Sequence, residues 1–346
     1  MSYVFPLDEC GAHLAEVVGG KALGLGSLIR QELRVPPGFA VGTHAYREFV
    51  SETGLHGAIH ELLAGADSIE EQAEASRRIG RLFEERELLA SIHEEVAAAY
   101  AGLGEPPVAV RSSAISEDAA EASFAGEHET YLWIQGAGAV ARSVVRCWAS
   151  LFTPQALSYF RRVTLRAGET AMGVVVQQMV AAEAAGVMIT IDPVTGDRSQ
   201  IAIEASYGLG QAVVAGEVTP DRYAVDKVLL EIRSRTLSRK HVAYRFDPGA
   251  GEVRAVDVPP EEQELACVSD EEVIEVASLG KRVERALGQP QDIEWAIGPE
   301  RVVHLLQTRP ETVWSQKPAA PAASSTASSA IARLAQAMAR PPKSPQ

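Results

Sequence analysis

Hydrophobic and polar residues alternate most clearly near the end of the chain, in QDIEWAIGPERVVHLLQTRP from Gln291 to Pro310. Two apolar-rich runs, DIEWAI and RVVHLLQT, lie on either side of Gly298-Pro299-Glu300, and this pattern predicts a β-hairpin with a short loop. Side chains alternate between the two faces of a strand, so each strand is expected to gather polar side chains on one face. These sets are Asp292, Glu294 and Ala296 on the first strand, and Leu305, Gln307 and Arg309 on the second.

The length of the loop decides whether the two polar sets share a face. A loop with an even number of residues, such as the four from Gly298 to Arg301, places Asp292 opposite Gln307, whereas a slip of one residue separates the sets. Two carboxylates, an amide oxygen and a guanidinium on one face suit Mg²⁺ with a polyphosphate, because hard oxygen ligands hold the metal and arginine neutralises the phosphoryl group. An exposed polar face on an ordinary hairpin accounts for the same pattern.

Other periodic stretches predict both helices and strands. Helical spacing of apolar residues is present in 68–100, 139–152 and 270–287. MGVVVQQMV, Met172 to Val180, and the following AGVMITIDP predict buried strands. Such a pair can form the wall of an adenine pocket, with core packing as the alternative for most of its residues.

A glycine pair precedes Lys21 in VVGGKALGLGSL. Glycines let the backbone approach a ligand, and the residues that follow predict a helix start, where unpaired N–H groups attract anions. Lys21 is then placed to pair with phosphate, and a glycine turn with a solvated lysine is the competing interpretation. The segment is not a P-loop, because Ala15 stands where the first glycine belongs and Ala22 replaces the metal-binding hydroxyl.

The stretch VAVRSSAISEDAAEASFAGEHETYLWI predicts a strand, a loop of small residues and a second strand. Arg111 lies at the end of the first strand, and Gly126 lies in the loop. Such a flap can cover phosphates with its backbone N–H groups, and Arg111 would add a fixed positive fork. A mobile surface loop is the alternative. Further on, Gly208-x-Gly210 follows a predicted strand, but position 213 is valine, so a Rossmann dinucleotide site is not predicted.

Composition restricts the class of protein. The chain has 346 residues, of which 46% are hydrophobic, so about two globular domains are expected. The formal net charge of -14 argues against a general nucleic-acid or membrane surface, because such surfaces need a basic face. An anionic ligand must therefore meet a local cluster of lysine and arginine.

The compartment expected from the sequence is the cytoplasm. Cys10, Cys147 and Cys267 are odd in number, far apart and without metal-ligand spacing. The first residues, MSYVFPLDE, lack the basic start and apolar core of a signal peptide. In addition, no apolar run approaches the ~20 residues of a membrane span.

Seven stretches form an ordered set: GGKALGLG, VPPGFAV, VAVRSSA with SFAG, VVVQQMV, AGVMITIDPVTGDR, EASYGLGQAVVAGEVTPD, and DIEWAI with LLQTRPET. In order and approximate spacing, from about Leu14 to Thr312, they resemble the N-terminal nucleotide-binding region of the phosphoenolpyruvate synthase and pyruvate phosphate dikinase family. The resemblance implies an α+β protein with the ATP-grasp fold, in which two lobes with antiparallel sheets clasp ATP. It also implies Mg²⁺ as a cofactor.

The predicted division of the chain follows from this resemblance and from composition. Residues 1–105 are expected to form a largely helical N-terminal lobe, and residues 106–312 the remainder of the ATP-grasp region with the flap and the hairpin. Residues 313–346 include QKPAAPAASSTASS, a linker-like composition, and are expected to be disordered.

The resemblance implies a nucleotide site in which Lys21 and Arg111 contact phosphates and Gly126 lies in the covering loop. It places the adenine against the strand end formed by Gln178, Met179 and Val180. These expectations concern binding, and Lys21 and Arg111 are also expected to assist the reaction.

The resemblance further implies a metal and transfer site on the hairpin. Glu294 and Gln307 are expected to hold Mg²⁺ with support from Asp292, and Arg309 is expected to stabilise the transferring phosphoryl group. Glu204 is a weaker candidate in the same cleft.

Members of this family continue into a domain whose histidine, in a G-G-x-T-S-H-like segment, carries phosphate to a second active site. None of the eight histidines of this sequence lies in such a segment. We therefore expect the ATP-binding subunit of a split phosphotransferase with a histidine-bearing partner. The resemblance implies two candidates: phenylphosphate synthase, a family member with a stand-alone subunit of this kind, and a split phosphoenolpyruvate synthase or antibiotic phosphotransferase. A self-sufficient kinase or ligase acting on a small acid and a nucleotide-sensing subunit are the alternatives.

Overall fold

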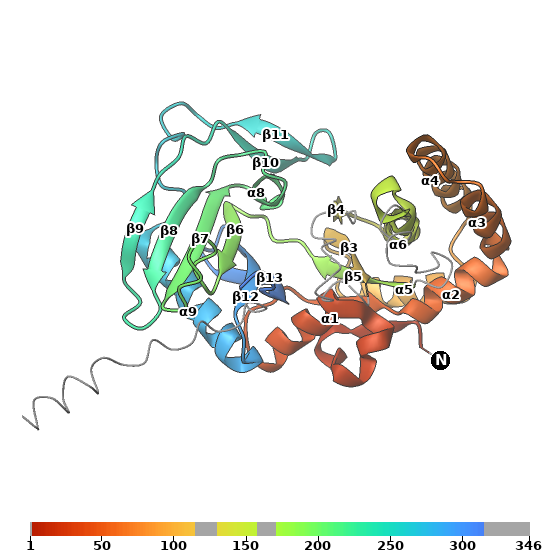
Figure 1. Cartoon of the computed structure of the whole chain (residues 1–346), viewed down its shortest axis with the longest axis horizontal. Helices are drawn as coiled ribbons and strands as arrows, with labels where there is room; N and C mark the ends of the chain where they lie inside the picture. Colours follow the sequence, from red (N-terminus) through yellow and green to blue (C-terminus); the bar gives the residue numbers. More distant parts are fainter. Residues whose placement is uncertain (1, 115–129, 158–170, 315–346) are drawn as a thin grey trace, which may run out of the picture. The chain divides into compact units, whose positions relative to one another are not determined.

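The computed structural model describes residues 2–114, 130–157 and 171–314. The chain divides into two compact units, Met1–Glu311 and Thr312–Gln346. All the elements described below lie in the first unit (Figure 1). Most of the predicted tail, 313–346, and the predicted loop residue Gly126 lie outside the described residues.

The first sheet has the strand order β1-β2-β5-β3-β4, and its neighbouring strands are antiparallel. Alternation along β5 sends Val174 and Val176 into one core and Val175 into another. The first core is formed with helices α2 to α6, and the second with α1. The strands are β1 (Val4–Pro6), β2 (Gly38–Val41), β3 (Val108–Ala114), β4 (Thr130–Ile134) and β5 (Met172–Gln178). The helices are α1 (Ala15–Arg30), α2 (Thr43–Glu52), α3 (Leu55–Ala64), α4 (Ile69–Glu84), α5 (Ala90–Gly102) and α6 (Ala137–Ala149), with 3-10 turns at Leu7–Glu9, Ala12–Leu14 and Ser150–Phe152.

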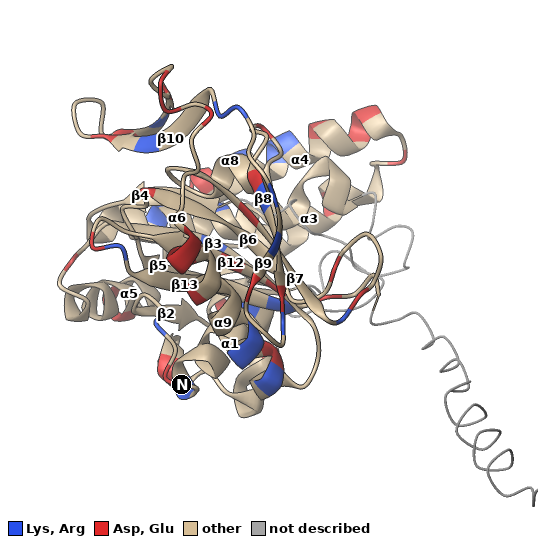
Figure 2. Cartoon of the chain, turned by 90° about the vertical axis from the view of Figure 1, so that its left-hand side faces the viewer, with Lys and Arg blue, Asp and Glu red and all other residues tan. Residues whose placement is uncertain are grey.

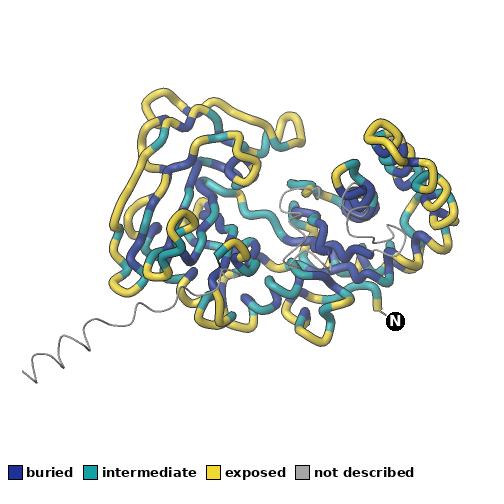
Figure 3. The backbone as a smooth tube through the Cα atoms, in the orientation of Figure 1, coloured by how far each residue is buried: buried dark blue, intermediate teal, exposed yellow. Residues whose placement is uncertain are grey.

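The second sheet has the order β13-β12-β6-β7-β8-β9, again with antiparallel neighbours. Helix α9 (Asp270–Leu287) covers one face, where its apolar side chains join Ile203, Ile293 and Trp295 in a buried core. Figure 3 shows the backbone coloured by burial, with the buried positions in dark blue. The strands are β6 (Ala184–Ile189), β7 (Gln200–Tyr207), β8 (Asp221–Asp226), β9 (Ile232–Thr236), β12 (Gln291–Ile297) and β13 (Val303–Pro310). A separate hairpin is formed by β10 (Val242–Asp247) and β11 (Glu252–Asp257), and α8 is the short helix Gln211–Val214.

The predicted α+β class with two antiparallel sheets is therefore confirmed, and it is the architecture expected of an ATP-grasp fold. The predicted buried strands around 172–180 and 185–193 do not pair with each other, because β5 belongs to the first sheet and β6 to the second. The first sheet combines β1 and β2 with strands that follow residue 105. A division of folding units at that residue stays a prediction.

Helix α1 contacts both sheets through glycines. Gly19 interrupts the helix with a φ of 76°. A Cβ atom there would lie 2.0 Å from the carbonyl oxygen of Ser113 on β3. A Cβ at Gly24 would lie 2.7 Å from the carbonyl oxygen of Thr308 on β13. The glycines around Lys21 thus serve close backbone packing, which places Lys21 between the two sheets.

A second contact joins the β10–β11 hairpin to the first sheet. The rings of Trp133 on β4 and Phe246 on β10 stack with centroids 4.7 Å apart and an interplanar angle of 11°. Trp133 lies where the register of β4 shifts against β3, and its φ of 60° is unusual for a bulky residue. The bulge thus aims the indole at the β10–β11 hairpin, which forms a two-stranded sheet of its own among the described residues.

A buried ion pair holds β8 to the segment before β10. Lys240 donates to Asp221 at 2.6 Å, and both side chains are 0% exposed. Asp221 also accepts hydrogen bonds from the backbone N–H groups of Ser238 and Cys267. The Asp221 carboxylate is thus almost entirely satisfied by groups of the protein.

Replacing Lys240 by methionine is expected to lower the free energy of unfolding by about 3 to 5 kcal/mol, because it leaves a buried carboxylate without its counter-charge. Urea denaturation of the chain measures this change. Arg254→Met, which removes an exposed arginine paired with Glu252, is the matched control and should change stability by less than about 0.5 kcal/mol. Equal small effects of both substitutions would contradict the assignment.

Candidate functional site

The hairpin of β12 and β13 differs from the prediction in its loop and register. The loop runs from Gly298 to Val302, because Ile297 pairs with Val303, so the predicted four-residue loop and the pairing of Asp292 with Gln307 are wrong. An odd loop by itself would put the two polar sets on opposite faces. A register shift between Glu294 and Trp295 leaves Leu306 as an extra residue on β13 and restores the common face.

As a result, Asp292 lies opposite Arg309, and Glu294 lies opposite Gln307. The predicted gathering of these four polar side chains on one sheet face is therefore present, with different partners. Leu305 is the exception: it pairs with Trp295 and is buried in the core under α9, so its predicted place on the polar face is wrong. The bulge reverses the alternation between Leu305 and Gln307.

Arg111 reaches this face from the first sheet. Its Nη2 forms a short ion pair with a carboxylate oxygen of Glu294, and its Nη1 donates to the carbonyl oxygen of Leu306 at 3.1 Å. Leu306 is the bulged residue, so Arg111 contacts the second sheet at the bulge itself. The side chains of Arg111 and Glu294 are 12% and 22% exposed, which makes this a largely buried bridge between the sheets.

Arg309 pairs with the second carboxylate of the face. Its Nε and Nη2 donate to one oxygen of Asp292 at 2.9 and 2.7 Å. Burial raises the pKa of the Asp292 carboxyl above its usual value, although Arg309 opposes the rise. Burial also acts to raise the pKa of Glu294, but Arg111, with Lys21 and Arg309, outweighs it and leaves that pKa below its usual value.

Lys21, Arg111 and Arg309 therefore all act on one carboxylate, Glu294. They come from α1, β3 and β13, which belong to widely separated parts of the sequence. In the view of Figure 2, basic and acidic residues are otherwise interspersed over the molecule. Because the chain is acidic overall, an anionic ligand was expected to need a local cluster of lysine and arginine. Lys21, Arg111 and Arg309 form such a cluster at this face.

Buried polar atoms at this face lack hydrogen-bond partners. Among the described residues, neither the Oε1 atom of Gln307 nor the Nε atom of Arg111 has one. A buried amide oxygen without a partner is costly, and a ligand or metal ion at this position would satisfy it. The predicted metal ligand Gln307 thus presents an acceptor atom to the same face as Glu294.

The row across the sheet continues from Glu294 through Val187 on β6 to Glu204 on β7. Residues directly opposite each other share a face, so Glu204 lies on the Glu294 face. Its carboxylate accepts a hydrogen bond from Nε of Arg222 at 2.9 Å. Glu204 is therefore on the predicted cleft face, and its strand β7 is the second strand from β12, which carries Glu294.

The predicted adenine border lies at the other end of β12. Gln178 ends β5, and Met179 and Val180 follow it in the connection to β6. The backbone N–H of Glu183 donates to the carbonyl of Ile297 at 2.8 Å. A Cβ atom at Gly298 would touch the Val180 side chain at 3.4 Å, so Val180 lies against the hairpin loop.

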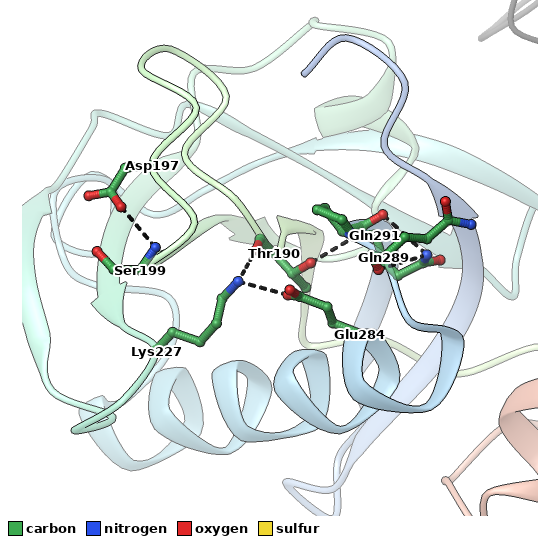
Figure 4. A network of polar contacts seen from close by, with 8 residues as sticks. Thr190, Asp197, Ser199, Lys227, Glu284, Gln289 and Gln291 are labelled. Atoms are coloured by element: carbon green, nitrogen blue, oxygen red, sulfur yellow. Dashed lines mark hydrogen bonds and ion pairs between the residues drawn. The ribbon is translucent and has the colours of Figure 1, made fainter. Parts of the chain in front are cut away.

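Sequence reasoning missed the polar residues that fix the strand ends (Figure 4). Gln291 is fully buried, and its Oε1 accepts a hydrogen bond from Thr308 at 2.9 Å. Its backbone N–H donates to the hydroxyl of Thr190, whose carbonyl in turn accepts from Lys227. A polar residue next to Asp292 in a strand was the available signal, but its partners are distant in sequence.

The donor set fits Mg²⁺ better than a metal that needs a complete protein cage. Among the described residues, no group of three or more histidine, cysteine, aspartate or glutamate side chains is placed to hold a metal ion. Mg²⁺ commonly binds through one or two carboxylates together with substrate phosphates and water. Glu294, Asp292 and the unsatisfied amide oxygen of Gln307 match that requirement. None of the described helices is both long enough and apolar enough to cross a membrane.

Comparisons with known proteins agree with the sequence resemblance. A family model described as "Pyruvate phosphate dikinase, AMP/ATP-binding domain" matches residues 15–329. Phosphoenolpyruvate synthase of Aeropyrum pernix is 42% identical over 90% of this chain and 42% of that protein. A probable phosphoenolpyruvate synthase of Methanocaldococcus jannaschii is 40% identical over 90% of this chain and 27% of that protein.

A rifampicin phosphotransferase of Streptomyces sviceus is 40% identical over 90% of this chain and 36% of that protein. The chain therefore spans less than half the length of these relatives. Among solved structures, biotin carboxylase of Campylobacter jejuni covers 70% of this chain and 41% of its own with 7% identity and a TM-score of 0.30. Both the sequence identity and the TM-score of this match are low, and nothing below rests on it.

Proposed function

This chain belongs to the pyruvate phosphate dikinase AMP/ATP-binding domain family, and on that premise we propose that it binds Mg-ATP as the nucleotide-binding part of a split phosphotransferase. It transfers a phosphoryl or pyrophosphoryl group from ATP to a histidine on a partner chain. The observation that carries this proposal is the meeting of Arg111 with Glu294 and the Leu306 carbonyl. That contact joins Arg111 of the first sheet to Glu294 of the second. Arginine commonly binds phosphate, and glutamate commonly binds Mg²⁺.

The nucleotide would lie along β12. Val180 and the hairpin loop are at the Ile297 end, and the pair of Asp292 and Arg309 is at the other. Five residue steps at about 3.3 Å each separate the two ends by roughly 16 Å. ATP extended along this strand would place its adenine against the β5–β6 connection and its phosphates near Lys21, Arg111 and Arg309.

Mg²⁺, when bound, would neutralise charge on the phosphate oxygens, and Glu294, Gln307 and Asp292 are the residues to hold it. The roles of the other residues follow from their positions. Lys21 and Arg111 orient the phosphates, because the Leu306 carbonyl holds Arg111 in place and α1 brings Lys21 close enough to act on Glu294. Arg309 stabilises the negative charge that develops on the transferring group.

The proposal of a partner chain rests on the histidines of this sequence. None of the eight lies in a G-G-x-T-S-H-like segment. The acceptor histidine would therefore be supplied from outside this sequence.

Lys21→Ala and Arg111→Ala are each expected to weaken Mg-ATP binding by about 1 to 3 kcal/mol, because each removes a charge-assisted contact to phosphate. Isothermal titration calorimetry of the chain with Mg-ATP measures the change. Lys281→Ala removes an exposed lysine of α9 and serves as the control. If both site variants bound Mg-ATP with wild-type affinity, Lys21 and Arg111 would be solvated charges with no role in binding. If the wild-type chain showed no Mg-dependent binding of ATP, the proposed function would be refuted.

A further inference from the structure

The carboxylates and the arginines of the proposed site are paired with one another. Arg309 holds Asp292, and Arg111 holds Glu294. If the proposed function is correct, the same carboxylates hold Mg²⁺ and the same arginines hold phosphate. Binding of either ligand must therefore replace ion pairs that the protein already makes.

We propose that Mg²⁺ and the nucleotide phosphates bind to this site only together, because the two arginine–carboxylate pairs exchange partners in one step. This inference rests on the proposed function and adds a mechanism of regulation to it. Arg309 controls the access of the metal ion to Asp292. Its guanidinium stays paired with the Asp292 carboxylate until a phosphate group replaces that carboxylate as its partner.

Each carboxylate of the site already has an arginine partner. Arg111 pairs with Glu294, and Arg309 pairs with Asp292. A divalent cation alone therefore meets carboxylates that are already paired, and a polyphosphate alone meets arginines that are already paired. Each ligand alone would also leave Arg111 or Glu294, which are both largely buried, without its present partner, and this is strongly unfavourable.

The two ion pairs differ in how readily they open. Arg111 is held independently of Glu294, because its Nη1 also donates to the Leu306 carbonyl at 3.1 Å. It can release Glu294 and remain aligned, and its Nε atom, which has no partner among the described residues, is a further donor for phosphate. The Arg309 side chain, which donates two hydrogen bonds to Asp292, is 40% exposed. The exchange therefore begins at Arg309.

This arrangement predicts opposite effects of one substitution on two ligands. Arg309→Gln removes the cation that occupies Asp292, so it should strengthen binding of a divalent cation alone while weakening binding of the metal–nucleotide complex. A residue with a merely structural role would weaken both. Arg222→Gln is the matched control, because Arg222 pairs with Glu204 on the same sheet face but is 64% exposed and outside the cluster.

The experiment measures Mn²⁺ binding to the full chain by electron paramagnetic resonance of the unbound ion, with and without an ATP analogue whose β–γ bridge cannot be hydrolysed. Wild-type protein should bind Mn²⁺ at least 10-fold more tightly with the analogue than expected from the metal–analogue complex in solution. Arg309→Gln should bind Mn²⁺ alone at least 10-fold more tightly than wild type, Arg309→Lys should show a smaller gain, and Arg222→Gln should match wild type. Circular dichroism checks that the variants are folded.

Two results would overturn the exchange. One is wild-type protein whose Mn²⁺ binding in the presence of the analogue is fully explained by its binding of Mn²⁺ alone and by the metal–analogue complex in solution, a measurement that needs no variant. The other is folded Arg309→Gln with unchanged or weaker binding of Mn²⁺ alone. Failure of the proposed function is a different outcome, since it appears as wild-type protein that does not bind the analogue in the presence of Mg²⁺.

Discussion

Glu294→Gln is expected to lower the rate of phosphate transfer from Mg-ATP by about 10²-fold or more, in line with other preorganised electrostatic groups. The amide is nearly the same size as the carboxylate, but it removes one negative charge from the proposed metal site. Glutamine also cannot form the ion pair that Glu294 makes with Arg111. The measurement is transfer of label from ATP to a histidine-bearing partner over a range of Mg²⁺ concentrations.

Arg309→Ala should cause a loss of similar size for a different reason, because it removes positive charge from the transferring phosphoryl group. Glu275→Gln on α9 is the control for both, since Glu275 pairs with Arg34 at the protein surface. Full activity of Glu294→Gln with an unaltered dependence on Mg²⁺ would refute the assignment of this residue. Thermal denaturation of each variant separates a lost function from a lost fold.

The isolated chain is expected to turn over little ATP and to form no stable phosphohistidine. Phosphoryl transfer needs a nucleophile within about 3 to 3.5 Å of phosphorus, and the chain offers no histidine in the carrier context. Addition of the histidine-bearing polypeptide should produce acid-labile label on that partner. ATP labelled separately at the β and γ positions decides whether a phosphoryl or a pyrophosphoryl group is moved.

Acid-labile label on this chain in the absence of a partner, or fast ATP use coupled to a small acid, would overturn the split-enzyme proposal. His304 provides a test of self-labelling. His304 is on β13 and pairs with Ala296 of β12, two residues after Glu294, and burial together with Arg34 lowers the pKa of its imidazole. Because the proposed acceptor is a histidine of the partner, His304→Asn should leave the labelling of the partner unchanged. If the wild-type chain became labelled by itself and His304→Asn did not, the label would be assigned to His304.

Local sequence patterns were sufficient for elements whose stability depends on near neighbours. The helix predicted at 270–287 has those bounds in the structure. Its apolar period faces the second sheet, and Ser269 and Glu272 form a capping box at its start. The alternation of Asp292 and Glu294 on one face of a strand was predictable for the same reason.

Strand register was not predictable from the same stretch. The hairpin loop is longer than expected, and only the bulge at Leu306 returns Gln307 and Arg309 to the face of Asp292 and Glu294. The carbonyl of that bulge is bound by Arg111, which is 195 residues away in sequence. A contact over that separation leaves no periodic signal in either segment.

The sequence by itself determined which chemical groups are available and, through seven ordered stretches, the family and the α+β class of the fold. Only the tertiary structure decided that Lys21, Arg111 and Arg309 act on one carboxylate. Their meeting depends on the close packing of α1 against β3 at Gly19 and against β13 at Gly24, where any side chain would collide with a backbone carbonyl. Such packing is set by the three-dimensional approach of distant segments, and local propensity carries no information about it.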